Sequence, residues 1–406
     1  MFIQRHIKNA FFERSKWNGA VIVTGARQVG KTSLVENLLP NIPKVELDDR
    51  LTLEMAKNST VHFMELNPPP VFIDEVQYAP EIFHYIKMNV DKSKKKGQYF
   101  LSGSQPFRLM QNVSESLAGR AGVLTLYGLS LREINQDTWD KPFLPTMEYL
   151  LERKRGRVDT NIKVLWEIIW RGSYPELYEK PDYPWDIYYS DYLKTYIERD
   201  VRDLARVGDE LQFLQFIRVL ATRTANILNL NDVAKEIQIS HHTAKHWLSI
   251  LQTTGIVHLL PPYHNIFGKR VVKSPKLYFT DTGLASYLAR WNSPESLMTG
   301  AMSGAYLETF VVNEIVKSYA NFGKEAEIYF FRDSNGIEID LLLYENGALY
   351  PLEIKSTSNP RPNMTKAFDI IDTIPDIKRG EGGVICLSKE LLPLRNNDKI
   401  IPVWAI

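Results

Sequence analysis

The sequence has little cysteine, little net charge and no long apolar run. Cys386 is the only cysteine in 406 residues, which excludes a disulfide framework and a zinc site built from several thiolates. A formal net charge of +1 argues against a globally basic nucleic-acid binder, so any such contact must come from local patches. No apolar run approaches the roughly 18 residues of a membrane span, and residues 1–6 lack a signal-peptide core. We therefore expect no membrane contact and a cytoplasmic location.

The length and the composition are those of a soluble protein with several domains. A chain of 406 residues suggests two to four domains rather than one. Its content of 44% hydrophobic and 24% charged residues is ordinary for globular proteins. Function must therefore be inferred from motifs rather than from composition.

The most informative stretch is residues 25–32, which read G-x-x-x-x-G-K-T. It follows an apolar strand at 20–24 and precedes a helical run at 33–39, so its backbone N–H groups and the helix dipole can bind phosphate. Lys31 can reach the outer phosphates, and the Thr32 hydroxyl can hold Mg²⁺. The sequence therefore predicts a nucleotide phosphate site that also holds Mg²⁺. The predicted nucleotide-binding residues are Gly25, Ala26, Arg27, Gln28, Val29, Gly30, Lys31, Thr32 and Ser33.

Two carboxylates end the apolar strand at residues 71–75. In open α/β sheets the carboxyl ends of the strands face the ligand crevice. We expect Asp74 to hold the Mg²⁺ shell through water and Glu75 to act as general base on the attacking water.

Other polar residues follow the next two predicted strands. Residues 98–101 lead into Ser102 and Ser104, either of which could sense the γ-phosphate or position water, although a simple Gly–Ser turn is the alternative. Arg120 precedes strand 123–127 and is a candidate arginine finger, acting in cis or from a neighbouring subunit. A surface arginine in a salt bridge is an equally reasonable interpretation of Arg120.

These motifs resemble those of AAA-type P-loop ATPases over residues 18–135. The matching segments are G-A-R-Q-V-G-K-T, V-F-I-D-E-V-Q, L-S-G-S-Q and L-A-G-R. The order of motifs in the rest of the chain resembles that of a family of prokaryotic AAA ATPases whose C-terminal domain has no assigned function. The segments that carry this second resemblance are R-G-S-Y-P-E at 171–176, Y-I-E-R-D-V at 196–201 and K-L-Y-F-T-D-T-G-L at 276–284. A homo-oligomer is a further expectation.

Residues 211–262 and the strand after them have the pattern of a winged helix-turn-helix. Ser240 is a good N-cap for a helix at 241–254, and strands at 257–260 and 276–279 would form the wing. The helix carries His241, His242, Lys245 and His246, and the wing carries Lys269, Arg270, Lys273 and Lys276. We expect the helix to face a DNA groove and the wing to bind phosphates. A winged helix used only for packing is the alternative.

Strands at 327–332, 337–344 and 349–355 are predicted in the C-terminal part, and the Asn346-Gly347 turn sets the register of the last two. This register places Asp340 opposite Glu353, and Ile339 opposite Ile354. Lys355 lies on the same face as the two acids, and Glu308 on the preceding helix is a further possible ligand. The predicted metal ligands are Asp340, Glu353 and Glu308, with Lys355 positioning or deprotonating water.

This set of charged residues resembles the restriction-endonuclease-like PD-(D/E)XK core, without the proline that names the motif. A cross-strand salt-bridge ladder with Glu338 opposite Lys355 is the alternative.

The predicted fold class is α/β with four parts. They are a parallel-sheet AAA-type ATPase domain at 1–140, a helical lid at 141–205, a winged helix-turn-helix at 206–291 and a nuclease-like α/β domain at 292–406. We interpret the chain as an ATPase coupled to DNA binding and to metal-dependent DNA cleavage. The alternatives are a non-cleaving ATP-dependent switch that binds DNA or protein, and a scaffold in which ATP only fixes the domain arrangement.

Overall fold

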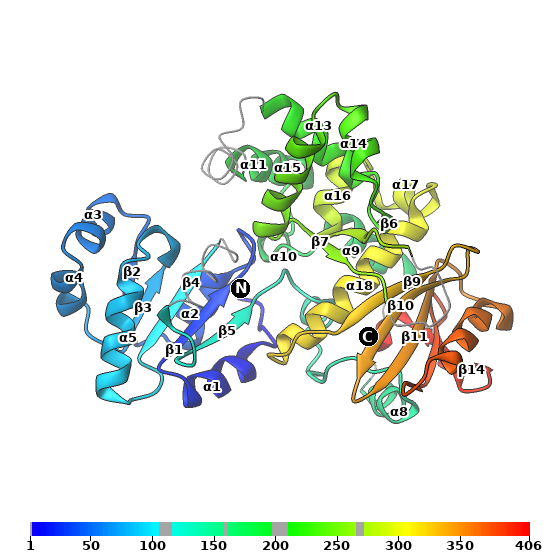
Figure 1. The fold of residues 1–406 in the computed structure, drawn as a ribbon, viewed down its shortest axis with the longest axis horizontal. Helices are drawn as coiled ribbons and strands as arrows, with labels where there is room; N and C mark the ends of the chain where they lie inside the picture. Colours follow the sequence, from blue (N-terminus) through cyan, green and yellow to red (C-terminus); the bar gives the residue numbers. More distant parts are fainter. Residues whose placement is uncertain (1, 105–115, 157–160, 197–209, 265–271) are drawn as a thin grey trace.

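The computed structural model describes residues 2–104, 116–156, 161–196, 210–264 and 272–406. The ATPase part, the middle helices and the C-terminal sheet are seen together in Figure 1. The predicted wing residues Lys269 and Arg270 lie outside the described residues. Among the described helices, none is both long and apolar enough to cross a membrane.

The N-terminal part is built on a parallel sheet, as predicted. Within the described residues its five strands follow the order β2-β3-β4-β1-β5. Strands β1 and β3 are buried along their whole length, which is why they read as continuous apolar runs. The strands are β1 (Ala20–Thr24), β2 (Lys44–Glu46), β3 (Val71–Asp74), β4 (Tyr99–Gly103) and β5 (Ala121–Thr125). The helices are α1 (Lys8–Trp17), α2 (Lys31–Leu38), α3 (Arg50–Asn58), α4 (Thr60–Leu66), η1 (Val76–Tyr78) and α5 (Ile82–Ser93).

The middle part is mostly helical and carries a small antiparallel sheet. That sheet has the order β6-β8-β7 in the described part of the chain. Its strands are β6 (Asn226–Ile227), β7 (Val257–Leu260) and β8 (Lys276–Phe279). The helices before this sheet are α7 (Leu131–Ile134), α8 (Met147–Arg155), α9 (Ile162–Arg171), α10 (Pro175–Glu179), α11 (Trp185–Tyr196) and α13 (Glu210–Ala221). The remaining helices are α14 (Leu230–Glu236), α15 (His241–Thr253), α16 (Thr282–Leu288) and α17 (Pro294–Thr299).

Helices and strands form in this part where the sequence predicts them, and the winged-helix assignment stays a prediction. The predicted helix at 241–254 is α15, and the Ser240 hydroxyl accepts the Thr243 N–H at 3.0 Å, as expected for its N-cap. Strands β7 and β8 pair from Val257 opposite Phe279 to Leu260 opposite Lys276.

The C-terminal part is a long helix on a mixed sheet. Within the described residues the strand order is β14-β15-β13-β11-β10-β9, and β12 pairs with β11. The elements are α18 (Ser303–Asn321), β9 (Ile328–Arg332), β10 (Glu338–Glu345), β11 (Ala348–Lys355), η3 (Pro362–Thr373), β12 (Lys378–Arg379), β13 (Gly382–Cys386), β14 (Leu392–Arg395), β15 (Asp398–Pro402) and η4 (Val403–Ala405).

The predicted hairpin register is confirmed near the turn. Asn346 and Gly347 both have positive φ angles, of 51° and 79°, as a two-residue turn of this kind requires. Residues 341–345 then pair with 348–352 as predicted.

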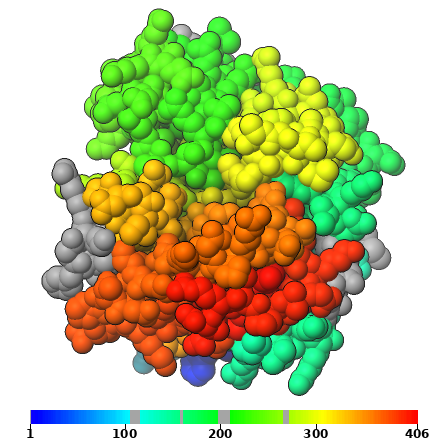
Figure 2. All heavy atoms as spheres, turned by 90° about the vertical axis from the view of Figure 1, so that its right-hand side faces the viewer, coloured from blue at the N-terminus to red at the C-terminus, as the bar shows by residue number. Residues whose placement is uncertain are grey.

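The three parts share one hydrophobic core. A single cluster of buried side chains includes Phe11 of α1, Trp247 of α15, Leu352 of β11 and Ile406. Figure 2 shows the middle part, in green and yellow, lying against the orange and red C-terminal sheet. The core therefore crosses the predicted domain limits, which stay predictions.

Candidate functional site

The phosphate loop connects the end of β1 to the start of α2. At Gly25 the φ angle is +152°, and a Cβ atom there would lie 2.1 Å from the Leu126 carbonyl oxygen. Gly30, the N-cap of α2, has a left-handed conformation with φ of 90°. The loop therefore needs glycine at both positions. The N-terminus of α2 is directed at the ligand site of the loop.

Lys31, Thr32 and Asp74 lie together at this loop. The Lys31 side chain is folded back, and its Nζ donates to the carbonyl oxygens of Gly25 at 3.1 Å and Ala26 at 2.8 Å. The Thr32 hydroxyl donates to Asp74 Oδ2 at 2.8 Å. The hydroxyl and the carboxylate predicted to hold Mg²⁺ are thus in direct contact.

Glu75 is held in a fixed position beside them. Its backbone has φ of 56°, an uncommon left-handed conformation for a residue with a side chain. Its Oε2 accepts from Gln77 Nε2 at 2.5 Å and from Ser104 Oγ at 3.0 Å. Ser102 instead donates to the other oxygen of Asp74. The structure therefore separates the two serines that the sequence left equivalent.

A cavity of about 610 Å³ opens over these residues. It is also lined by Phe2, Ile3 and the helix α10, so it lies between the ATPase sheet and the middle part. The predicted residues that line it are Arg27, Gln28, Gly30, Lys31, Thr32, Ser33 and Glu75. Gly25, Ala26 and Val29 are buried behind them. The volume falls within the usual range for small-ligand sites.

Arg5 supports the phosphate loop, also lines the cavity and was not identified from the sequence. Its guanidinium donates to the carbonyl oxygens of Val29 at 2.8 Å and Tyr127 at 2.7 Å, and pairs with Glu133 at 3.1 Å. Although burial opposes ionisation of Glu133, the Arg5 charge holds its pKa below the ordinary value. The capping box formed by Ser130 and Glu133 was readable as Ser-x-x-Glu, but its arginine partner was not.

A second contact joins the loop to the middle part. The Tyr188 hydroxyl on α11 donates to Gln28 Oε1 at 2.8 Å. Since Gln28 also lines the cavity, the position of α11 is coupled to the conformation of the phosphate loop.

Arg120 lies outside this cavity. Its guanidinium makes a two-pronged salt bridge with Asp91 on α5, at 2.6 Å from Nε and 2.9 Å from Nη2. The geometry matches the surface salt bridge considered as the alternative and gives no support to a finger acting in cis.

In the C-terminal part, Asp340, Glu353 and Lys355 come together as predicted. The Lys355 ammonium lies 2.9 Å from Asp340 Oδ2 and 2.6 Å from Glu353 Oε1. The predicted backbone pairings of Asp340 with Glu353 and of Ile339 with Ile354 are not among the pairs of this hairpin, which end at Leu341 and Leu352. The Ile354 N–H is instead donated to Asp340 Oδ2 at 2.9 Å. The hairpin pairing ends beside a register shift in β10, between Ile339 and Leu342, while the other edge of β11 pairs with β13 from Leu352 to Lys355.

The position of Lys276 differs from the sequence-based prediction. It was expected in a solvated wing, but it is only 3% exposed, because β8 packs beside α18 and β10. Its ammonium lies 3.0 Å from Glu308 Oε1, 3.0 Å from Glu338 Oε1 and 3.8 Å from Asp340 Oδ1. Glu338 is thus paired with Lys276 and not with Lys355 as the salt-bridge alternative proposed. We call Lys276, Glu308, Glu338, Asp340, Glu353 and Lys355 the acidic cluster.

Burial dominates the electrostatics of this cluster. It raises the pKa of Glu308 to about 7 and, together with the Asp340 charge, the pKa of Glu353 to about 8. Burial opposes the charge of Lys276, but the surrounding carboxylates outweigh it and raise the pKa of this lysine. Glu353 Oε2 is buried, and no described residue forms a hydrogen bond with it.

The acidic cluster does not form a metal-binding geometry as it stands. Within the part of the chain that the structure describes, no group of three or more His, Cys, Asp or Glu side chains is arranged to hold a metal ion. The predicted ligands Glu308, Asp340 and Glu353 are instead paired with the two lysines.

Comparisons with known proteins agree with the N-terminal site. Residues 18–135 match a family model described as an AAA domain. Residues 162–295 and 303–406 match two domains of unknown function, DUF8612 and DUF4143. Uncharacterized proteins of Mycobacterium bovis and Mycobacterium tuberculosis are each 26% identical over 383 residues, which cover 92% of this chain and 78% of theirs.

Two solved structures show weaker similarity. A Walker-type ATPase of Pyrococcus abyssi is 15% identical, with a TM-score of 0.45, over 71% of this chain and 96% of that chain. The RuvB Holliday junction branch migration motor of Thermotoga maritima is 14% identical, with a TM-score of 0.29, over 63% of this chain and 89% of that chain. From the family match and the geometry of the phosphate loop, residues 18–135 are an AAA-type P-loop ATPase domain.

Proposed function

We propose that the chain hydrolyses ATP with Mg²⁺ at the phosphate loop. The observation that carries this proposal is the contact of Thr32 with Asp74 beside a Glu75 carboxylate that Gln77 and Ser104 hold in place. These residues lie at one end of a cavity of suitable size. Together they provide the groups that phosphoryl transfer to water requires.

Each residue has a separate task. The Lys31 ammonium leaves the carbonyl oxygens of Gly25 and Ala26 and binds the outer phosphates. Thr32 and Asp74 hold the Mg²⁺ shell, and the ion supplies charge neutralisation on the phosphate oxygens when bound. The Glu75 carboxylate orients a water molecule and accepts its proton as the oxygen attacks the γ-phosphorus. The N–H groups of the loop and of α2 bind the remaining phosphate charge.

Two substitutions test these roles. Lys31→Ala should abolish ATP binding, whereas Glu75→Gln should keep ATP bound and slow phosphate release by about two to four orders of magnitude. Phosphate release and binding of a fluorescent ATP analogue should be measured on both variants, with Lys95→Ala as a surface control. Equal turnover in wild type and Glu75→Gln would remove the general-base assignment.

We further propose that the middle part contacts DNA through α15. Its exposed face carries His241, His242, Lys245 and His246, while Trp247 and its neighbours on the other face are buried. Lys273 is exposed in the described end of the predicted wing. Lys276 is not part of this surface, because it is buried in the acidic cluster.

The DNA proposal is tested by the dependence of affinity on salt. Replacing Lys245, Lys269, Arg270 and Lys273 by alanine should weaken DNA binding and make the slope of log affinity against log salt shallower. Replacing the exposed Lys92, Lys94, Lys95 and Lys96 by alanine is the matched control, since it removes four positive charges from another surface. If the two multiple variants change the slope equally, α15 and the wing are not the DNA contact.

The two alternatives for bound DNA are that the chain cleaves it and that the chain only binds it, as a non-cleaving switch. The acidic cluster favours the non-cleaving switch. Lys276 and Lys355 already form salt bridges with the carboxylates that a metal ion would need. In favour of cleavage stands the buried Glu353 Oε2, which has no hydrogen-bond partner among the described residues. Supercoiled, linear and single-stranded DNA should stay intact with ATP and Mg²⁺ or Mn²⁺. Cleavage that Asp340→Asn abolishes would instead establish the nuclease.

A further inference from the structure

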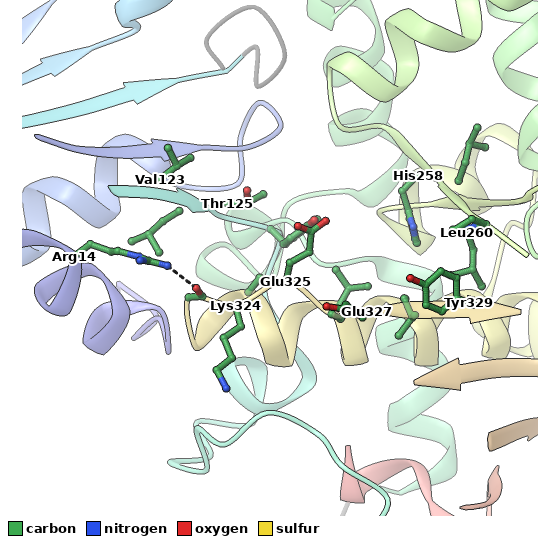
Figure 3. Close-up of a pocket in the computed structure, with 18 residues that line it drawn as sticks. Arg14, Val123, Thr125, His258, Leu260, Lys324, Glu325, Glu327 and Tyr329 are labelled. Atoms are coloured by element: carbon green, nitrogen blue, oxygen red, sulfur yellow. Dashed lines mark hydrogen bonds between the residues drawn. The ribbon is translucent and has the colours of Figure 1, made fainter. Parts of the chain in front are cut away.

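A second cavity, of about 730 Å³, lies between the ATPase sheet and the C-terminal part (Figure 3). One wall is strand β5, and the opposite wall is β7 together with the segment that leads into β9. Among the described residues, none that lines this cavity also lines the phosphate-loop cavity. It therefore needs an explanation of its own. We call it the β5 groove.

The β5 wall is an open sheet edge. Strand β5 ends the strand order and pairs only with β1 among the described strands. The two outermost bonds of this pairing use the Arg120 carbonyl oxygen and the Leu126 N–H, so the even-numbered positions of β5 face β1. Because successive residues of a strand face opposite sides, the N–H and C=O groups of Val123 and Thr125 point away from β1. No hydrogen bond on that side is recorded for them within the described chain.

Both of these residues line the β5 groove. An unpaired edge next to a cavity is a template on which an extended chain can add a strand. The main-chain groups of Val123 and Thr125 would then supply affinity that does not depend on the side chains of the ligand.

The charge of the groove selects the kind of chain that can bind. Glu325 and Glu327 line it and are exposed, and no salt bridge is recorded for either carboxylate within the described residues. The basic residues nearby balance them only in part, because Arg14 keeps its positive charge whereas Lys324 is directed away. Figure 3 shows the Lys324 side chain directed away from the cavity, and the Arg14 guanidinium donates to the Gly323 carbonyl oxygen at 3.0 Å.

The His258 imidazole also provides no positive charge. Burial lowers the pKa of His258 to about 4, so this ring is neutral at pH 7. Its Nε2 is hydrogen-bonded to Asn313 Oδ1 at 3.1 Å. With two glutamates and one arginine lining it, the groove has more negative than positive charge at neutral pH, which disfavours nucleic acid and favours a basic ligand.

We propose that the β5 groove binds an extended, basic segment of a partner protein as an additional strand on β5. Lysine or arginine side chains at alternate positions share one face of such a strand and pair with Glu325 and Glu327. The groove joins the ATPase sheet to the C-terminal part, so the bound segment contacts both. This inference does not depend on the proposed ATP hydrolysis or DNA contact.

The test uses a fluorescein-labelled ten-residue peptide of alternating lysine and valine, with fluorescence anisotropy on the full chain. We expect saturable binding, and none for the same peptide with glutamate in place of lysine. The double variant Glu325→Gln, Glu327→Gln should bind the lysine peptide about 2- to 30-fold more weakly, the range expected for losing two exposed ion pairs. Glu54→Gln with Glu65→Gln, on α3 and α4, is the matched control for total charge. A thermal melt of each variant checks that the fold is intact.

Two N-methylated peptides separate strand addition from simple charge attraction. One carries N-methyl groups on every lysine and the other on every valine. Only one of these two sets of N–H groups can face β5, so one peptide should bind like the unmodified probe and the other should not bind. Equal binding of both peptides would overturn the proposal, and so would no binding of the unmodified peptide up to about 1 mM. A control variant that weakens binding as much as the Glu325 and Glu327 double variant would overturn it as well.

Discussion

Lys276→Met tests whether a lysine from the middle part stabilises the acidic cluster. Methionine keeps a long, flexible side chain and removes only the charge. Lys276 is 3% exposed and lies within 3.0 Å of both Glu308 and Glu338. Removing one partner of a buried ion pair typically costs about 3–5 kcal/mol, because the remaining charge is left uncompensated in the interior.

The size of the effect should depend on pH. The pKa of Glu308 is already raised to about 7 by burial, so below that pH Glu308 can take up a proton and no longer needs the lysine. We therefore expect a loss of about 3–5 kcal/mol at pH 8 and a smaller loss at pH 6. Urea unfolding followed by tryptophan fluorescence at both pH values measures this difference.

The exposed Lys273, three residues away, provides the control. Lys273→Met should change stability by no more than about 0.5 kcal/mol, as surface substitutions usually do. If Lys276→Met loses no more free energy of unfolding than Lys273→Met at both pH values, Lys276 does not hold the carboxylates together. Titration of Lys276→Met with Mg²⁺ and Mn²⁺ then asks whether the freed carboxylates accept a metal in its place.

Three further predictions concern other sites. Burial and the Asp340 charge raise the pKa of Glu353 to about 8 in the folded chain, against an ordinary value near 4.5. Between these two pH values the folded state keeps a proton that the unfolded state releases, so stability falls as the pH rises. Glu353→Gln should therefore melt at a higher temperature than wild type at pH 8 and at the same temperature near pH 4.5. If Arg120 acts in trans, Arg120→Ala protein mixed with Lys31→Ala protein should recover ATP turnover, whereas no recovery despite proven association would leave Arg120 as the surface partner of Asp91. Gly25→Ala should lower ATP affinity and the melting temperature together, since its Cβ would collide with a backbone carbonyl, and unchanged melting would contradict this reasoning.

Features set by local sequence could be predicted well. The phosphate loop, the Ser240 N-cap and the turn at Asn346 and Gly347 each depend on residues within a few positions of one another. Near the turn, the hairpin register follows from the turn alone, and this is why the predicted pairing holds as far as Leu341 and Leu352.

Features that depend on distant residues could not be predicted. Arg5 and Glu133 are 128 positions apart, and nothing in the sequence around either one indicates the other. The burial of Lys276 depends on how β8 packs against α18, so a basic stretch in the sequence was interpreted as a solvated wing. The hairpin pairing ends beside a register shift between β10 and β9, and the turn at Asn346 and Gly347 does not indicate that shift.

Helix α18 has a consequence for dissecting the molecule. Its Glu314 carboxylate accepts the Leu131 N–H at 2.7 Å, and its Lys317 ammonium donates to the Leu129 carbonyl oxygen at 2.8 Å. Both backbone groups belong to the segment that follows the ATPase sheet. A chain cut before Ser303 would remove the partners of the Leu131 N–H and the Leu129 carbonyl oxygen. The cost is about 1–3 kcal/mol for each of these groups that stays buried. The ATPase domain is thus a recognisable unit of sequence that α18 helps to stabilise, and an excised N-terminal fragment should be less stable than the full chain.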